Sequence, residues 1–118
     1  MNFEPRMKAI GQFHGLREKE GKVFAKLSVC KSKDCQVEYI VTVDQDLIDQ
    51  YKQCFSMAGH AADYSLERLF SYLQKGVYEF EISSPGAIPR MKEGRMYVVN
   101  TGVLVMAEYK TQSLSSKH

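Results

Sequence analysis

The feature that most constrains the fold is a stretch in which polar and apolar side chains alternate. It runs from Lys22 to Val29 with the sequence K-V-F-A-K-L-S-V. Successive side chains of a β-strand point to opposite faces of its sheet. One face would therefore be apolar, formed by Val23, Ala25, Leu27 and Val29. The other face would combine cations with an aromatic ring, through Lys22, Phe24 and Lys26.

The mixed face has two interpretations. Single-stranded nucleic acids bind to surfaces of this kind, because cations follow the phosphates while a ring stacks on a base. An ordinary solvated strand with one stray phenylalanine gives the same pattern, since isolated apolar residues are common on protein surfaces. The rest of the chain has to decide between them.

The remaining pattern predicts a mainly β chain with a helical insert. Further strands are expected at residues 7–13, 36–43, 77–83, 95–99 and 103–109. Between residues 44 and 75 the apolar residues fall at helical spacing, which predicts two helices, with Asp44 and Ser65 as their N-caps. The charged segments 15–21 and 84–94 contain glycine or proline and are expected to be loops. Gly11, inside the first strand, is expected to mark a bulge or a bend.

This order of elements is that of the OB fold, a five-stranded Greek-key β-barrel, here with a helical segment between strands 3 and 4. We expect a single domain over residues 1–110 and a flexible polar tail over residues 111–118. OB folds bind oligonucleotides through strands 2 and 3 and the loops that join strands 1 to 2 and 4 to 5. Nucleic-acid-binding residues are therefore predicted at Arg17, Lys19, Lys22, Phe24, Lys26, Tyr39, Arg90 and Lys92.

The charge distribution fits this hypothesis better than the net charge of +2 does. Residues 1–35 hold eight Lys/Arg against four Asp/Glu, residues 36–81 hold three against eight, and residues 82–118 hold five against two. Two basic segments thus flank an acidic middle. A positive surface follows if the two ends meet in space, and the local field matters more to a polyanion than the total charge.

The chain resembles the small single-stranded DNA-binding proteins of filamentous phages. The resemblance rests on the length, on the basic opening hairpin, on the segment G-V-Y-E-F-E-I-S-S at residues 76–84, and on the M-Y-V-V and V-L-V strands that follow a basic segment. It implies an OB-type barrel that forms a homodimer and coats single-stranded DNA during phage replication, without sequence preference and without catalysis. It also implies that Phe24 and Tyr39 stack on bases while the lysines and arginines named above contact phosphates. The helical insert departs from the shortest members of that family, which are nearly all β.

Other chemistry has weaker support. Cys30, Cys35, Cys54 and His60 have a spacing that allows a zinc site, but paired C-x-x-C knuckles are absent and Cys54 falls on the apolar stripe of a helix, where a buried thiol is the simpler explanation. We therefore expect no metal, no cofactor, no small-molecule substrate and no enzymatic activity. The main alternative is a small β-barrel adaptor that binds another protein and no nucleic acid.

Cellular location is inferred from what the sequence lacks. The amino terminus has no apolar core of a secretion signal, and no apolar run approaches the ~20 residues that cross a bilayer. Three cysteines without dense spacing fit a reducing compartment. We expect the protein in the cytoplasm, that of the host cell if a phage encodes it, with single-stranded DNA as its partner; the choice between DNA and RNA is left open.

Overall fold

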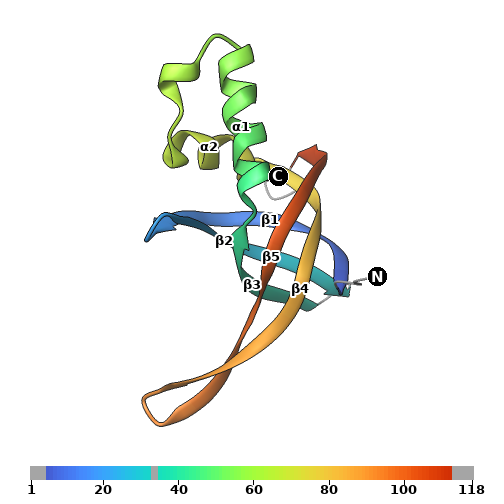
Figure 1. The fold of residues 1–118 in the computed structure, drawn as a ribbon. Helices are drawn as coiled ribbons and strands as arrows, with labels where there is room; N and C mark the ends of the chain where they lie inside the picture. The colour runs from blue at the N-terminus through green and yellow to red at the C-terminus, as the bar shows by residue number, and fades with distance from the viewer. Residues whose placement is uncertain (1–4, 33–34, 113–118) are drawn as a thin grey trace, which may run out of the picture.

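Five strands close into a barrel in the order β1-β2-β3-β5-β4 (Figure 1). The computed structural model describes residues 5–32 and 35–112. The strands are β1 (Arg6–Lys19), β2 (Lys22–Ser32), β3 (Cys35–Val43), β4 (Gly76–Lys92) and β5 (Arg95–Gln112). The helices are α1 (Gln45–Met57), the short 3₁₀ turn η1 (Ala61–Asp63) and α2 (Leu66–Leu73). The predicted OB-like barrel, mainly β with its helical segment between β3 and β4, is confirmed.

The barrel is closed by the one parallel pairing in the described chain, between β3 and β5. This pairing is short: its partners are Tyr39 with Asn100, Thr42 with Val103, and Val43 with Leu104. Two hydrogen bonds support it, from the side-chain amide of Asn100 to the carbonyl of Glu38 at 3.1 Å and from the amide of Asp44 to the carbonyl of Leu104 at 2.9 Å. All other neighbouring strands are antiparallel.

The interior is filled by the alternating apolar side chains of the strands. Ala25, Leu27 and Val29 of β2 are all buried, as the alternation predicted. The ring of Phe13 packs edge-on against those of Tyr78 and Phe80, with ring centroids 5.3 and 5.1 Å apart. Edge-to-face contacts of this kind stabilise aromatic clusters beyond the area that they bury.

Two segments predicted as loops are strands, which corrects the sequence-based assignment. Segment 15–21 belongs mostly to β1, and segment 84–94 belongs mostly to β4. Each hairpin turns within two residues, Glu20-Gly21 and Glu93-Gly94, whose φ angles are all positive, between 53° and 79°. Two-residue turns with two positive φ angles match the twist of paired strands, so the ladders continue to the tips.

The second hairpin extends beyond the barrel as a two-stranded ribbon, residues 86–101, which protrudes in Figure 1. It leaves the barrel at an irregularity between Ser83 and Gly86, where Ser84 has a φ of 51°. Pro89 lies within β4, beyond the part of that strand that pairs with β1. Proline is tolerated there because it lies in a strand with a free edge.

Gly11 does not lie at a bulge, one of the two alternatives predicted for it. It pairs in regular register with Val29, and the irregularity in β1 lies between Phe13 and Gly15. A side chain at Gly11 would collide with the backbone carbonyl of Ser28. Glycine is therefore needed here because two backbones approach closely.

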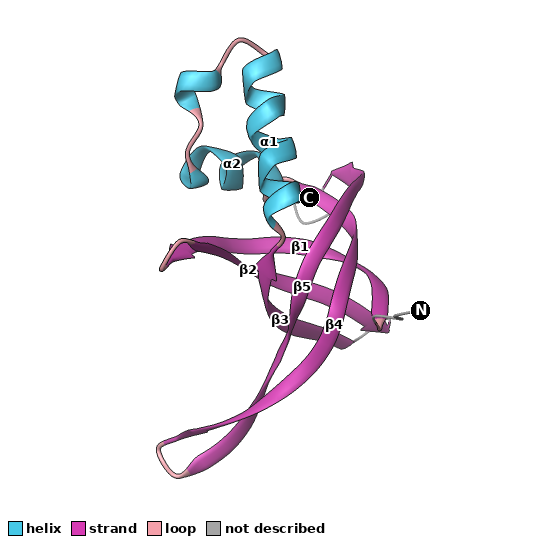
Figure 2. Ribbon diagram, viewed as in Figure 1, coloured by secondary structure: helices cyan, strands magenta, loops and turns pink. Residues whose placement is uncertain are grey.

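The helical insert covers one end of the barrel, opposite the ribbon (Figure 2). Ser65 caps α2 as predicted, since its hydroxyl accepts a hydrogen bond from the amide of Arg68 at 3.1 Å. Asp44 stands at the N-cap position of α1, but its side chain makes no capping hydrogen bond. No helix of the described chain has the length and apolar character needed to cross a membrane.

The predicted polar tail is partly strand, because β5 continues to Gln112. Residues 113–118 of that tail lie outside the described residues.

Candidate nucleic-acid interface

A groove of about 590 Å³ lies on the outer surface between the β1–β2 hairpin, Ile40 of β3 and Arg90 of the ribbon. Five of the eight predicted binding residues line it, and they come from two hairpins far apart in the sequence. The lining residues are Gly15, Leu16, Arg17, Lys19, Phe24, Ala25, Lys26, Ile40 and Arg90. Cations from both basic segments, residues 1–35 and 82–118, thus line one concave surface.

The strand register explains why these side chains share a face. Arg17 pairs with Phe24, and Lys26 pairs with both Gly15 and Ile40. Residues directly opposite each other in a sheet point to the same side. Gly15 has no side chain to fill the groove. A Cβ placed there would meet no heavy atom closer than the Cβ of Lys26, at 3.8 Å, so this part of the surface is open. The groove therefore has the half-buried ring of Phe24 and the exposed side chain of Ile40 among its cations.

Tyr39 is not available for stacking, which corrects its predicted role. Its side chain is only 6% exposed and belongs to the core, where its hydroxyl lies 3.6 Å from the sulfur of Met7. The register explains this, since Tyr39 pairs with the fully buried Leu27 and so points inward. The outward position belongs to Ile40, which sequence reasoning missed because an aromatic residue was sought. Aligning residues 36–43 with the buried face of β2 would have identified it.

Lys22 and Lys92 are exposed but do not line the groove. They stand at the two hairpin tips, where each faces another cation directly across the ladder: Lys19 with Lys22, and Lys92 with Arg95. Like charges directly opposite each other destabilise a sheet. A bound anion relieves this repulsion. Arg95 was not predicted, although the repeated sequence cation–Glu–Gly–cation at both tips carries the signal.

The cations of the two hairpins are available to a ligand. Within residues 5–32 and 35–112, no ion pair involves any of the following: Arg17, Lys19, Lys22, Arg90, Lys92 and Arg95. Lys26 lies 3.4 Å from a carboxylate oxygen of Glu38, and both side chains are about half exposed. Exposed pairs of this kind contribute little, so a phosphate competes readily with Glu38.

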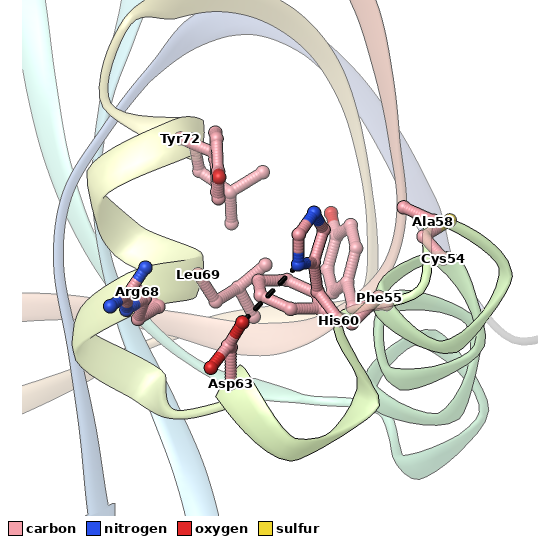
Figure 3. A pocket seen from close by; sticks show the side chains of 10 residues that line it. Cys54, Phe55, Ala58, His60, Asp63, Arg68, Leu69 and Tyr72 are labelled. Carbon is pink, nitrogen blue, oxygen red and sulfur yellow. Dashed lines mark hydrogen bonds and ion pairs between the residues drawn. The ribbon is translucent and has the colours of Figure 1, made fainter.

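A second pocket, of about 420 Å³, lies between α1 and α2 and is mostly apolar and aromatic (Figure 3). Cys54 and His60 both line it, and His60 pairs with Asp63 through Nδ1 and Oδ2 at 3.2 Å. Cys54 is exposed, contrary to the expectation of a buried thiol.

The four residues of the hypothetical zinc site are not brought together as far as the structure describes them. Cys30 and Cys54 form no disulfide within the described residues, and the side chain of Cys35 lies outside what the structure describes. The described residues contain no group of three or more His, Cys, Asp or Glu that would hold a metal ion.

Comparison with known proteins shows the fold. The chain matches no protein-family model and no curated protein sequence. It is similar to the crystal structure of Rim1, a mitochondrial single-stranded DNA binding protein from S. cerevisiae, with a TM-score of 0.59 over 96% of this chain and 100% of that chain. The two share the fold of an OB-type barrel. Their sequences are 11% identical, so the likeness extends to architecture alone.

Proposed function

We propose that this protein binds single-stranded DNA and coats it without sequence preference. The observation that carries the proposal is the groove, in which Phe24 and Ile40 lie among Arg17, Lys19, Lys26 and Arg90. OB folds bind oligonucleotides at the corresponding surface. The structural neighbour Rim1, which binds single-stranded DNA, has the same barrel.

The mechanism combines stacking with phosphate contacts. A base stacks on the ring of Phe24 and contacts Ile40, while the guanidinium and ammonium groups around them neutralise neighbouring phosphates. Every base presents a flat face, so contacts of this kind discriminate weakly between sequences. The cations at the hairpin tips, Lys22, Lys92 and Arg95, extend the positive surface beyond the groove. The net-negative helical insert packs on the other face of the β1–β2 hairpin, where Glu18 and Val23 share a pocket with Tyr64.

The biological setting belongs to the same proposal. The resemblance of the opening hairpin to phage proteins favours DNA replication in the cytoplasm, with a homodimer as the binding unit. A protein of this kind acts by sequestering the strand and needs no catalysis. RNA is the competing ligand, because stacking and phosphate contacts are common to both nucleic acids.

The test is a fluorescence-polarisation titration with labelled single-stranded and duplex oligonucleotides of equal length, at two salt concentrations. We expect binding to the single strand to exceed binding to the duplex and to weaken as salt rises, because counterions are released. A matched RNA strand decides between DNA and RNA. Absence of single-strand binding at low salt would refute the proposal.

A protein-binding adaptor is the second candidate, and the exposed apolar residues of the ribbon favour it. An apolar protein interface responds little to salt, in contrast to phosphate contacts. The same titration therefore separates the two functions.

A further inference from the structure

A second hollow, of about 460 Å³, lies on the outer surface of the sheet beside the groove. It is called the polar hollow below, and its lining residues are His14, Lys26, Ser28, Gln36, Val37 and Glu38. Lys26 lines both the polar hollow and the groove, so the two are adjacent. A strand whose phosphate is held by Lys26 therefore has a base of a neighbouring nucleotide at the polar hollow.

The strand register explains which side chains the polar hollow contains. Ser28 pairs with Glu38, and residues directly opposite each other point to the same side of a sheet. His14 is exposed and lies on β1, at the irregularity between Phe13 and Gly15. Because β2 lies between β1 and β3, the hollow has the ring of His14 on one side and the carboxylate of Glu38 on the other.

The polar hollow presents oriented hydrogen-bonding groups, in contrast to the cations and apolar side chains of the groove. The hydroxyl of Ser28 donates to Oε1 of Gln36 at 3.0 Å, which orients the amide and leaves its NH₂ group as the donor that it offers to a ligand. The carboxylate of Glu38 offers two acceptor oxygens. Unpaired bases are recognised by hydrogen bonds to their edges and by stacking on rings, including that of histidine.

We propose that the polar hollow selects a base with an amino group beside a ring N–H, which is guanine, and disfavours thymine. This inference rests on the proposed function and adds a base preference to a coat that otherwise ignores sequence. The neighbouring N1–H and N2–H groups of guanine donate to the two oxygens of Glu38, and O6 of guanine accepts from the amide of Gln36. The ring of His14 gives the base a surface for stacking. Thymine has two carbonyl oxygens around a single N–H, and these oxygens face the carboxylate unfavourably.

Lys26 couples the phosphate contact to the base contact. Without a ligand, its ammonium group lies 3.4 Å from a carboxylate oxygen of Glu38. A phosphate that binds Lys26 takes this cation away from Glu38 and places a second anion nearby. Guanine then supplies two donors to the carboxylate, whereas thymine brings further acceptors to the same place. An acceptor left without a donor is costly, and hydrogen bonds to a charged group are the strong ones, so both effects favour guanine.

The experiment is a fluorescence-polarisation titration of the full chain with labelled single strands of equal length at one salt concentration. The strands are oligo-thymidine, an alternating thymine–guanine repeat, and an alternating repeat of thymine with hypoxanthine, the guanine analogue that lacks the N2 amino group. We expect the guanine repeat to bind at least about 5-fold more tightly than oligo-thymidine, the discrimination typical of a bidentate contact with a base. The hypoxanthine repeat should lose most of this advantage, because one of the two donors is missing.

Glu38→Gln tests the residue on which the selection depends. The matched control is Glu108→Gln, which makes the same change of charge at an exposed residue of β5 that lines neither the groove nor the polar hollow. Both variants lose a negative charge and should bind every strand more tightly, so the readout is the ratio of affinities for the guanine repeat and oligo-thymidine. This ratio should fall to about twofold or less in Glu38→Gln and keep its wild-type value in the control.

The outcomes separate the inference from the proposed function. Equal affinity of the wild type for the guanine repeat and oligo-thymidine, or an unchanged ratio in Glu38→Gln, would overturn the base preference and leave single-strand binding standing. Absence of binding to every strand at low salt would overturn the proposed function, and the base preference with it.

Discussion

Replacing Phe24 by alanine tests whether the groove binds bases by stacking. The ring is half buried and lines the groove beside Arg17 and Lys26. Stacking of one base on an aromatic ring contributes about 1–3 kcal/mol. Since about 1.4 kcal/mol corresponds to a tenfold change in affinity, Phe24→Ala should weaken single-strand binding by about 5- to 150-fold at fixed salt.

The salt dependence separates stacking from charge. Each phosphate contact with a single strand contributes about −0.7 to the slope of log affinity against log salt, so the four cations of the groove predict a slope of about −3. Between about 50 and 200 mM salt, binding should therefore weaken by about 50-fold. Phe24→Ala should leave this slope unchanged, whereas Lys26→Ala should reduce its magnitude to about 2.

Fluorescence-polarisation titrations at three salt concentrations supply both quantities. Thr42→Ala is the matched control, because Thr42 pairs with Phe24 on the same face but does not line the groove. Its affinity should stay within about twofold of the wild type, since no stacking contact is lost. If Phe24→Ala binds as tightly as Thr42→Ala while its melting temperature shows a folded barrel, Phe24 has no place in the site and the reasoning fails.

Three further predictions concern stability. Gly11→Ala should destabilise the barrel by several kcal/mol or prevent folding, because its Cβ collides with the backbone of β2. Gly15→Ala, where a Cβ has space, should have a melting temperature near that of the wild type. Ser65→Ala should lower the free energy of unfolding by about 1 kcal/mol in urea titrations, through loss of the α2 cap, and leave DNA binding intact. Burial raises the pKa of the Tyr51 phenol, so the stability linked to its neutral form is present below pH 10 and is lost as pH rises further. Tyr51→Phe should flatten this alkaline loss in pH-dependent melts and raise stability at neutral pH, because the buried hydroxyl has no hydrogen-bond partner among the described residues.

The fold was predictable because its strongest signals are local. The alternation in β2 fixed which side chains are buried, and the change to helical spacing at residue 44 placed the insert between β3 and β4. Those two features suffice for the order of an OB-like barrel. The strands that continue to the two hairpin tips were predicted as loops, because glycine and proline usually indicate loops. In this chain Glu-Gly forms a tight turn, and Pro89 lies in a strand with a free edge.

Prediction of the site depended on register, which one strand alone does not show. The mixed face of β2 identified Phe24 and Lys26 directly, and the order of the fold brought Arg17, Lys19 and Arg90 to the same groove. Tyr39 was assigned to the wrong face, since an error of one residue in register reverses every side chain of a strand. The polar hollow depends on pairing between β2 and β3 and was hidden for the same reason.

The parallel contact between β3 and β5 has a consequence for how the molecule moves. It joins residues about sixty positions apart through three pairs, the shortest ladder in the described barrel, so few contacts offset the entropy lost when it closes. Asn100 lies both in this seam and at the root of the ribbon. We therefore expect the angle between the ribbon and the barrel to change most easily at this short β3–β5 ladder.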